Sequence, residues 1–69
     1  MNSNMEQLKA YSKANNVSFD AMASAAGMDI STFYRKVQKG PGAFTVGELQ
    51  RMVSGRVMTI EDAIRIFLS

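Results

Sequence analysis

The segment best equipped for chemistry is residues 30–39, with the sequence ISTFYRKVQK. Its hydroxyl, guanidinium and ammonium groups donate hydrogen bonds and attract anions. Phe33 and Val37 lie four residues apart, which places them on one face of a helix, and we expect that face to pack inward. The side chains that fall wholly or partly off that face, and are left to contact another molecule, are those of Ile30, Ser31, Tyr34 and Arg35.

The rest of the composition argues against catalysis. The chain of 69 residues contains no histidine and no cysteine. This removes the commonest general base, the commonest metal ligand and any disulfide or thiolate metal site. The sequence also shows no pair of carboxylates clearly held in a cleft. We therefore expect a protein that is not an enzyme and that binds no cofactor or metal. The lack of cysteine suits a reducing cytoplasm, where we expect the protein to work.

Positive charge is concentrated in one stretch of the chain. The formal net charge is only +2, but five of the eight basic residues lie between residues 30 and 58, where Glu48 is the only acid. Those basic residues are Arg35, Lys36, Lys39, Arg51 and Arg56. Such a distribution gives a nearly neutral protein a basic face, which favours binding to nucleic acid.

The polar segment belongs to one of five short helices that the sequence predicts. Their expected ranges are 5–14, 19–26, 30–38, 46–53 and 60–68. Capping patterns begin three of them, at Ser3–Glu6, Thr45–Glu48 and Thr59–Asp62. Residues 41–46 are the one place where a short extended piece is expected. These features predict an all-α fold, a compact bundle that forms a single domain over residues 1–69.

Apolar residues at helical spacing predict the core of this bundle. The stripes expected to be buried are Met5 and Leu8, then Phe19, Met22, Ala23 and Ala26, then Phe33 and Val37, then Val46, Leu49, Met52 and Val53, and finally Ile60, Ala63, Ile64 and Phe67. Ile66 and Leu68 fall off the last stripe, so we expect them to be exposed and to form a dimer contact. No apolar run is long enough to span a bilayer, and residues 1–13 lack the apolar core of a signal peptide.

Residues 19–40 form the most specific pattern in the chain, two helices joined by a tight turn. Ala23 sits where the helices cross closely, and a larger side chain there would push them apart. Gly27 ends the first helix, because a residue with positive φ is least strained there as glycine. Met28 can tuck under the turn, and Asp29 can cap the second helix by accepting a backbone N–H. This is the layout of a helix-turn-helix, whose second helix reads the major groove of DNA.

On these residues the chain resembles the small phage repressor and Cro proteins with the lambda-repressor-like fold. The resemblance covers most of the chain, and its specific part combines Ala23, Gly27 four residues later, Met28, and Phe33 six residues beyond the glycine. The stretch STFYRKV is also similar to the recognition helices of bacterial and phage regulators. The resemblance implies a lambda-repressor-like bundle with the helix-turn-helix at its second and third helices. It also implies a transcriptional regulator that binds operator DNA in the cytoplasm of a bacterial host.

Two positions depart from the family pattern. Phe19 stands where many members carry a glutamine that braces a phosphate contact. Ile30 stands at the first base-reading position, which is commonly polar. Its side chain can meet a thymine methyl group but makes no bidentate hydrogen bond. Sequence reading then depends mainly on the residues that follow Ile30.

A helix over residues 30–38 that enters the major groove of double-stranded DNA presents its N-terminal half to the base edges. Arg35 is the expected guanine ligand, because its guanidinium matches O6 and N7. Base reading is expected from Ile30, Ser31, Thr32 and Arg35. Contacts to the DNA backbone are expected from Tyr34, Lys36, Lys39 and Thr45, the last because it heads a helix whose N-terminus attracts anions.

A module of this size binds DNA weakly alone, so we expect a homodimer on two half-sites about 34–36 Å apart. The alternative is a protein-interaction module, such as an antirepressor or modulator that binds another regulator through the same helix-turn-helix surface. Its expected anchors are Ile30, Tyr34 and Ile66, since apolar and aromatic residues suit a protein interface. The basic stretch favours DNA, whereas Ile30 and the low net charge favour a partner protein.

Overall fold

The described part of the chain is entirely helical. The computed structural model describes the backbone of residues 3–68 and the side chains of residues 5–68. The elements are α1 (Ser3–Asn15), α2 (Phe19–Ala26), α3 (Ile30–Lys39), the 3-10 turn η1 (Pro41–Ala43), α4 (Val46–Ser54), α5 (Ile60–Ala63) and the π-helical η2 (Ile64–Leu68). No strand occurs over residues 3–68, so the expected all-α class is confirmed for them. The expected capping by Ser3 concerns a side chain outside the described residues.

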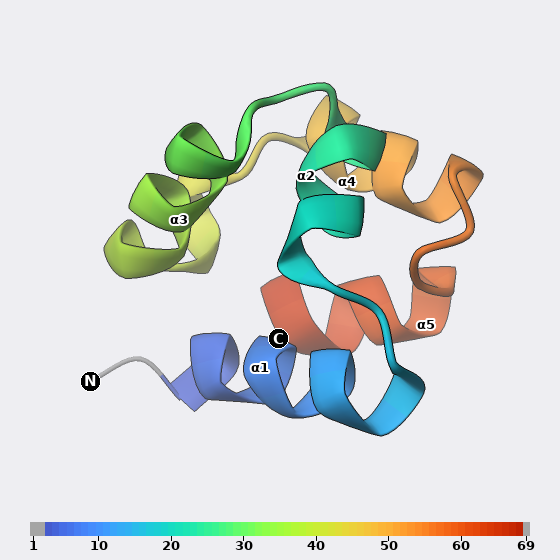
Figure 1. Cartoon of the computed structure of the whole chain (residues 1–69). Coiled ribbons are helices and arrows are strands. Elements are labelled where there is room, and N and C mark those ends of the chain that lie inside the picture. The colour runs from blue at the N-terminus through green and yellow to red at the C-terminus, as the bar shows by residue number, and fades with distance from the viewer. Residues whose placement is uncertain (1–2, 69) are drawn as a thin grey trace.

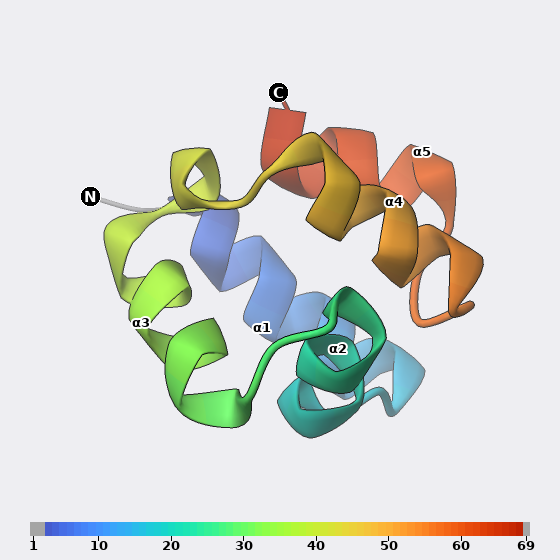
Figure 2. The ribbon, with the colours of Figure 1, turned by 90° about the horizontal axis from the view of Figure 1, so that it is seen from above.

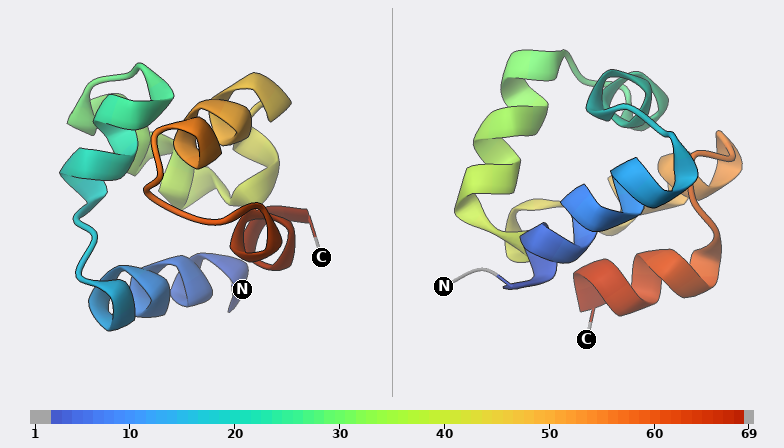
Figure 3. Two further views of the ribbon diagram at one scale, coloured as in Figure 1. Left: turned by 90° about the vertical axis from the view of Figure 1, so that its right-hand side faces the viewer. Right: turned by 60° about the horizontal axis from the view of Figure 1, so that its bottom comes forward.

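The helices are arranged so that α3 stands at one edge of the molecule. Figure 1 shows α1 and the C-terminal helix at the bottom, with α2 and α4 above them. Viewed from above, α2 and α3 lie toward one side and α4 and α5 toward the other (Figure 2). Two further views place α1 beside the C-terminal helix (Figure 3), where it packs against η2. The main contacts of α3 are with α2 and η1, so one side of α3 is left facing solvent.

Buried side chains from all the helices form a single core. Phe33 is fully buried, and its ring packs edge-to-face against Phe19 and Phe44 at centroid distances of 5.3 and 5.5 Å. Phe44 in turn contacts Phe67 at 5.0 Å, so a row of rings connects α2 and α3 to the C-terminal helix. The expected core residues that are confirmed as buried are Met5, Leu8, Met22, Ala23, Ala26, Phe33, Val37, Leu49, Met52, Ala63 and Phe67.

The C-terminal helix is rotated relative to the expected stripe. The predicted burial of Ile60 and Ile64 is wrong, because these side chains are 63% and 49% exposed. The prediction that Ile66 is an exposed dimer contact is also wrong, because Ile66 is fully buried. Ala63 and Phe67 are buried as expected, but Ile66 completes the buried side in place of Ile60 and Ile64. The i→i+5 hydrogen bonds of η2 also depart from the 3.6-residue period used in the prediction.

The short extended piece expected within residues 41–46 is confined to Phe44 and Thr45, whose backbone angles are extended, because Pro41–Ala43 forms the turn η1. Phe44 follows with extended backbone angles and is buried. Its side chain takes the place in the core that was predicted for Val46, which is 66% exposed in the first turn of α4.

Candidate functional site

The turn between α2 and α3 has the conformation that its sequence indicates. Gly27 adopts left-handed geometry with a φ of 82°, and the N–H of Met28 donates to the carbonyl of Ala23 at 3.0 Å. Arg51 of α4 donates a hydrogen bond to the carbonyl of Ala26 at 3.3 Å. A cation at this position also complements the negative end of the α2 dipole. The turn at Gly27 and the Arg51 contact therefore fix the direction of α3 relative to α2.

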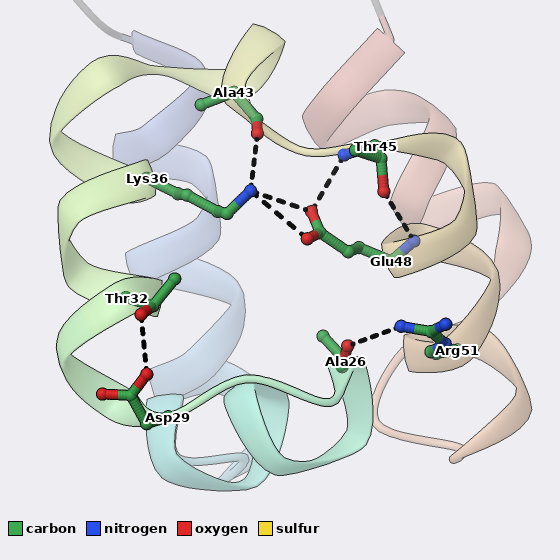
Figure 4. A network of polar contacts seen from close by, with 8 residues as sticks. All are labelled: Ala26, Asp29, Thr32, Lys36, Ala43, Thr45, Glu48 and Arg51. Atoms are coloured by element: carbon green, nitrogen blue, oxygen red, sulfur yellow. Dashed lines mark hydrogen bonds and ion pairs between the residues drawn. The ribbon is translucent and has the colours of Figure 1, made fainter.

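Asp29 is the N-cap residue of α3, but its carboxylate makes no capping hydrogen bond to the backbone and instead binds a side chain. It accepts a 2.6 Å hydrogen bond from the hydroxyl of Thr32 (Figure 4). That bond, supported by weaker interactions with nearby backbone N–H groups, holds the pKa of Asp29 below its ordinary value. Because the hydroxyl proton of Thr32 is donated to Asp29, this hydroxyl is left to face a base edge as an acceptor.

The exposed side chains of α3 define what we call the outer face: Ser31, Tyr34, Arg35, Gln38 and Lys39. Within residues 5–68, Arg35 and Lys39 take part in no ion pair, so their charges are available to an external anion. Gln38 is the member that sequence reasoning missed. A usable signal was present, since Gln38 lies seven residues after Ser31 and three after Arg35, which is the spacing of one helix face.

Two apolar or aromatic side chains at the border of the outer face differ in exposure. Tyr34 is 51% exposed, and its ring rests against Phe19 with 5.7 Å between centroids. Ile30 is partly buried and packs against the core. Ile30 thus contributes to packing beside the turn, and only part of its side chain is left for the expected contact with a base. Tyr34 remains in a position to contact a ligand of α3.

The edge of α3 that faces α4 is closed by a network of polar contacts (Figure 4). Nζ of Lys36 lies 3.2 Å from Oε2 of Glu48 and donates a hydrogen bond to the carbonyl of Ala43 at 3.1 Å. Glu48 accepts the backbone N–H of Thr45 at 2.9 Å, and its own N–H donates to the Thr45 hydroxyl at 3.1 Å. This reciprocal pair is the capping box expected at the start of α4.

The contacts of this network favour the ionised form of Glu48. Burial alone would raise the pKa of its carboxyl group. Hydrogen bonds from the Thr45 backbone and from Lys36, together with the charge of Lys36, outweigh that effect, so the pKa of Glu48 lies below its ordinary value. One carboxylate therefore joins α3 to the start of α4.

These contacts bear on two expectations about phosphate binding. The side chain of Lys36 is only 24% exposed, and its ammonium group is bound to Glu48 and to the carbonyl of Ala43, which leaves less of it for a phosphate than the sequence suggests. The N–H of Thr45 is donated to Glu48, whose negative charge lies where a phosphate was expected. The N-terminus of α4 is thus occupied by an anion of the protein itself.

The structure brings together only part of the predicted site. Ser31, Arg35, Tyr34 and Lys39 share the outer face, whereas Thr32, Lys36 and Thr45 make contacts within the protein. Of the two expected dimer contacts, Leu68 is 65% exposed and Ile66 is buried. Ile60, Ile64 and Leu68 follow one another at intervals of four residues, and we call these three exposed residues the apolar strip.

Comparisons with known proteins leave this geometry as the basis for any functional assignment. No family model, no curated protein and no solved structure matches the chain. No helix over residues 3–68 is long and apolar enough to cross a membrane. The candidate site is therefore the outer face of α3, together with the contacts that hold α3 in place.

Proposed function

We propose that this protein is a sequence-specific DNA-binding transcriptional regulator of the lambda-repressor type, with α2 and α3 as its helix-turn-helix. The observation that supports the proposal is the division of α3 into a buried side, a closed edge and an outer face whose cations pair with no acid among residues 5–68. A helix held in this way, with its polar side chains exposed, suits the major groove of double-stranded DNA, which is wide enough to admit an α-helix.

The outer face divides into residues that read bases and residues that bind phosphates. Arg35 reads a guanine through O6 and N7, and Ser31, one turn earlier, contacts a neighbouring base edge. Gln38, one turn later, has the amide that pairs with adenine N6 and N7. Lys39 and the hydroxyl of Tyr34 bind phosphates, which sets affinity and register without reading sequence.

We further propose that the regulator acts as a homodimer through the apolar strip. Ile60, Ile64 and Leu68 are spaced at four residues and are 63%, 49% and 65% exposed. Exposed apolar residues that gather on one helix mark a contact surface. Two copies joined there would present two α3 helices to half-sites about 34–36 Å apart. Sedimentation velocity tests this part, because Ile64→Asp should convert a dimer into a monomer, and a wild-type protein that is already monomeric contradicts it.

The protein-interaction alternative has less support from the described contacts. Of its three expected anchors, Ile66 is fully buried and Ile30 packs against the core. Of these anchors, only Tyr34 is exposed. The charges of Arg35 and Lys39 beside it, which form no ion pair within the described part of the chain, favour a polyanion over an apolar protein surface.

Selection of bound duplexes from a random-sequence library tests the DNA-binding proposal. We expect a shared motif containing a guanine, and we expect the preference for that guanine to disappear with Arg35→Ala. Anisotropy titrations with the selected duplex and a scrambled duplex at two salt concentrations complete the test. We expect tighter binding to the selected duplex and weaker binding at higher salt. Equal binding to both duplexes, or no binding at all, contradicts the proposal.

A further inference from the structure

A second cationic surface borders the outer face on the side of α1. An open hollow of about 620 Å³ is lined by Lys9 and Lys13 of α1, Phe19 and Asp20 of α2 and Tyr34 of α3, among others. Tyr34 belongs both to this hollow and to the outer face, so the two surfaces are continuous. The function proposed above makes no use of the α1 side of this hollow.

The hollow has the charge of an anion-binding surface. Lys9 and Lys13 lie four residues apart, so they project from the same side of α1. Both are exposed, and over residues 5–68 neither ammonium group takes part in an ion pair. Asp20 is the acid that shares the hollow with them. Two ammonium groups against one carboxylate leave the hollow with a net positive charge.

The remaining features favour the backbone of DNA as the anion. Cβ atoms four residues apart on a helix are about 5–6 Å from each other, so two flexible lysine side chains there can reach neighbouring phosphates of one strand. The rings of Phe19 and Tyr34, 5.7 Å apart, form an apolar surface beside the lysines that suits a deoxyribose. A chain of alternating sugars and phosphates matches this mixture of apolar and cationic groups.

We propose that Lys9 and Lys13 bind phosphates of the same duplex that α3 reads, on the stretch of backbone flanking the bases in contact with the outer face. The inference rests on the proposed function, because it uses the same DNA molecule. These contacts add affinity and salt dependence without sequence preference. They also lengthen the DNA segment needed for full affinity beyond the bases that α3 contacts.

Salt titrations of three variants test the inference. The probe is a fluorescein-labelled duplex of the selected sequence, long enough to extend about one helical turn beyond the motif on each side. Lys9→Gln and Lys13→Gln should each reduce the magnitude of the slope of log K against log salt by about 0.9, and the double variant by about twice that. Arg65→Gln is the matched control. It removes the same charge, but Arg65 pairs with Asp62 and lies beside Gln7 and Tyr11, on another side of α1.

Ethylation interference gives a position-resolved readout on the same duplex. The wild type should be blocked by ethylation of phosphates outside the motif, and these positions should lose their effect in the double variant. Slopes equal to that of Arg65→Gln, or an unchanged interference pattern, would overturn the inference while leaving the proposed function intact. A wild-type protein that shows no preference for the selected duplex would instead contradict the proposed function itself.

Discussion

Lys36 and Lys39 lie three residues apart on α3, yet their surroundings give them different roles. The ammonium group of Lys36 is held between Glu48 and the carbonyl of Ala43. Lys39 is exposed and, within residues 5–68, takes part in no ion pair. The two residues share their type, their charge and their helix. Whether the ammonium group is bound or free therefore depends on whether that edge of α3 faces the rest of the protein or the solvent. A lysine whose charge is satisfied inside the protein fixes the helix, whereas one facing solvent remains available to a phosphate.

The largest effect is expected on the buried side of α3. Phe33→Ala should lower the free energy of unfolding by about 3–5 kcal/mol, because this fully buried ring packs between Phe19 and Phe44. Such a loss approaches the whole stability of a small domain, so Phe33→Leu provides a milder variant. Tyr34→Ala, one residue later, should cost about 1 kcal/mol. Urea unfolding followed by circular dichroism measures both, and equal losses would contradict the division of α3 into two sides.

The next largest effect is expected on the outer face and concerns binding. Arg35→Ala should weaken binding to the selected duplex by about 1–3 kcal/mol and relax the preference at one base pair. Its free energy of unfolding should stay within about 0.5 kcal/mol of the wild type, because Arg35 is exposed and unpaired among the described residues. Anisotropy titrations measure the loss. If the scrambled duplex loses the same affinity, Arg35 contacts phosphate and reads no base.

Replacing each of the two lysines with methionine tests the comparison directly. Lys36→Met retains the apolar stem but leaves Glu48 without its ion pair, and should lower the free energy of unfolding by about 1–2 kcal/mol. It should leave the salt dependence of DNA binding unchanged. Lys39→Met should show the opposite pattern, with unchanged stability and a salt slope smaller in magnitude by about 0.9. A reduced slope for Lys36→Met would place its ammonium group on DNA and refute the closed edge.

The smallest effect is the pH dependence of the closed edge. The pKa of Glu48 is lowered in the folded protein from its ordinary value of 4.5. The carboxylate therefore stabilises the fold above about pH 4.5, and this contribution is lost as the pH falls through the lowered pKa. Glu48→Gln should be less stable than the wild type at neutral pH, and the difference should vanish in stronger acid. Thermal unfolding across this range measures it, and a difference that does not change with pH would show that the charge of Glu48 is not involved.

Much of the helical framework could be predicted from local signals in the sequence. Gly27 marks the turn because left-handed geometry favours glycine, and the Thr45–Glu48 pair marks the start of α4 because both groups satisfy free N–H donors. Phe33 and Val37 are buried as their spacing indicates. These features depend on neighbours in the chain, which a single sequence displays.

The parts that sequence reasoning missed depend on contacts between distant residues. The C-terminal helix carries two apolar stripes, and its packing against α1 and η1 goes with a buried Ile66 and an exposed Ile64. Lys36 was predicted to bind phosphate because its charge is visible in the sequence, while its distance to Glu48 is not. Which cations remain unpaired is therefore known only once α3 and α4 are packed together.

An NMR titration of the isotope-labelled protein with the selected duplex tests most directly whether the outer face of α3 is the DNA-binding surface. Intermolecular nuclear Overhauser contacts should join the side chains of Ser31, Arg35 and Gln38 to base protons of the major groove. The side-chain signals of Lys36 and Glu48 should show no contact with the duplex. Contacts from DNA to the apolar strip or to Lys36, with none to Arg35, would contradict the account.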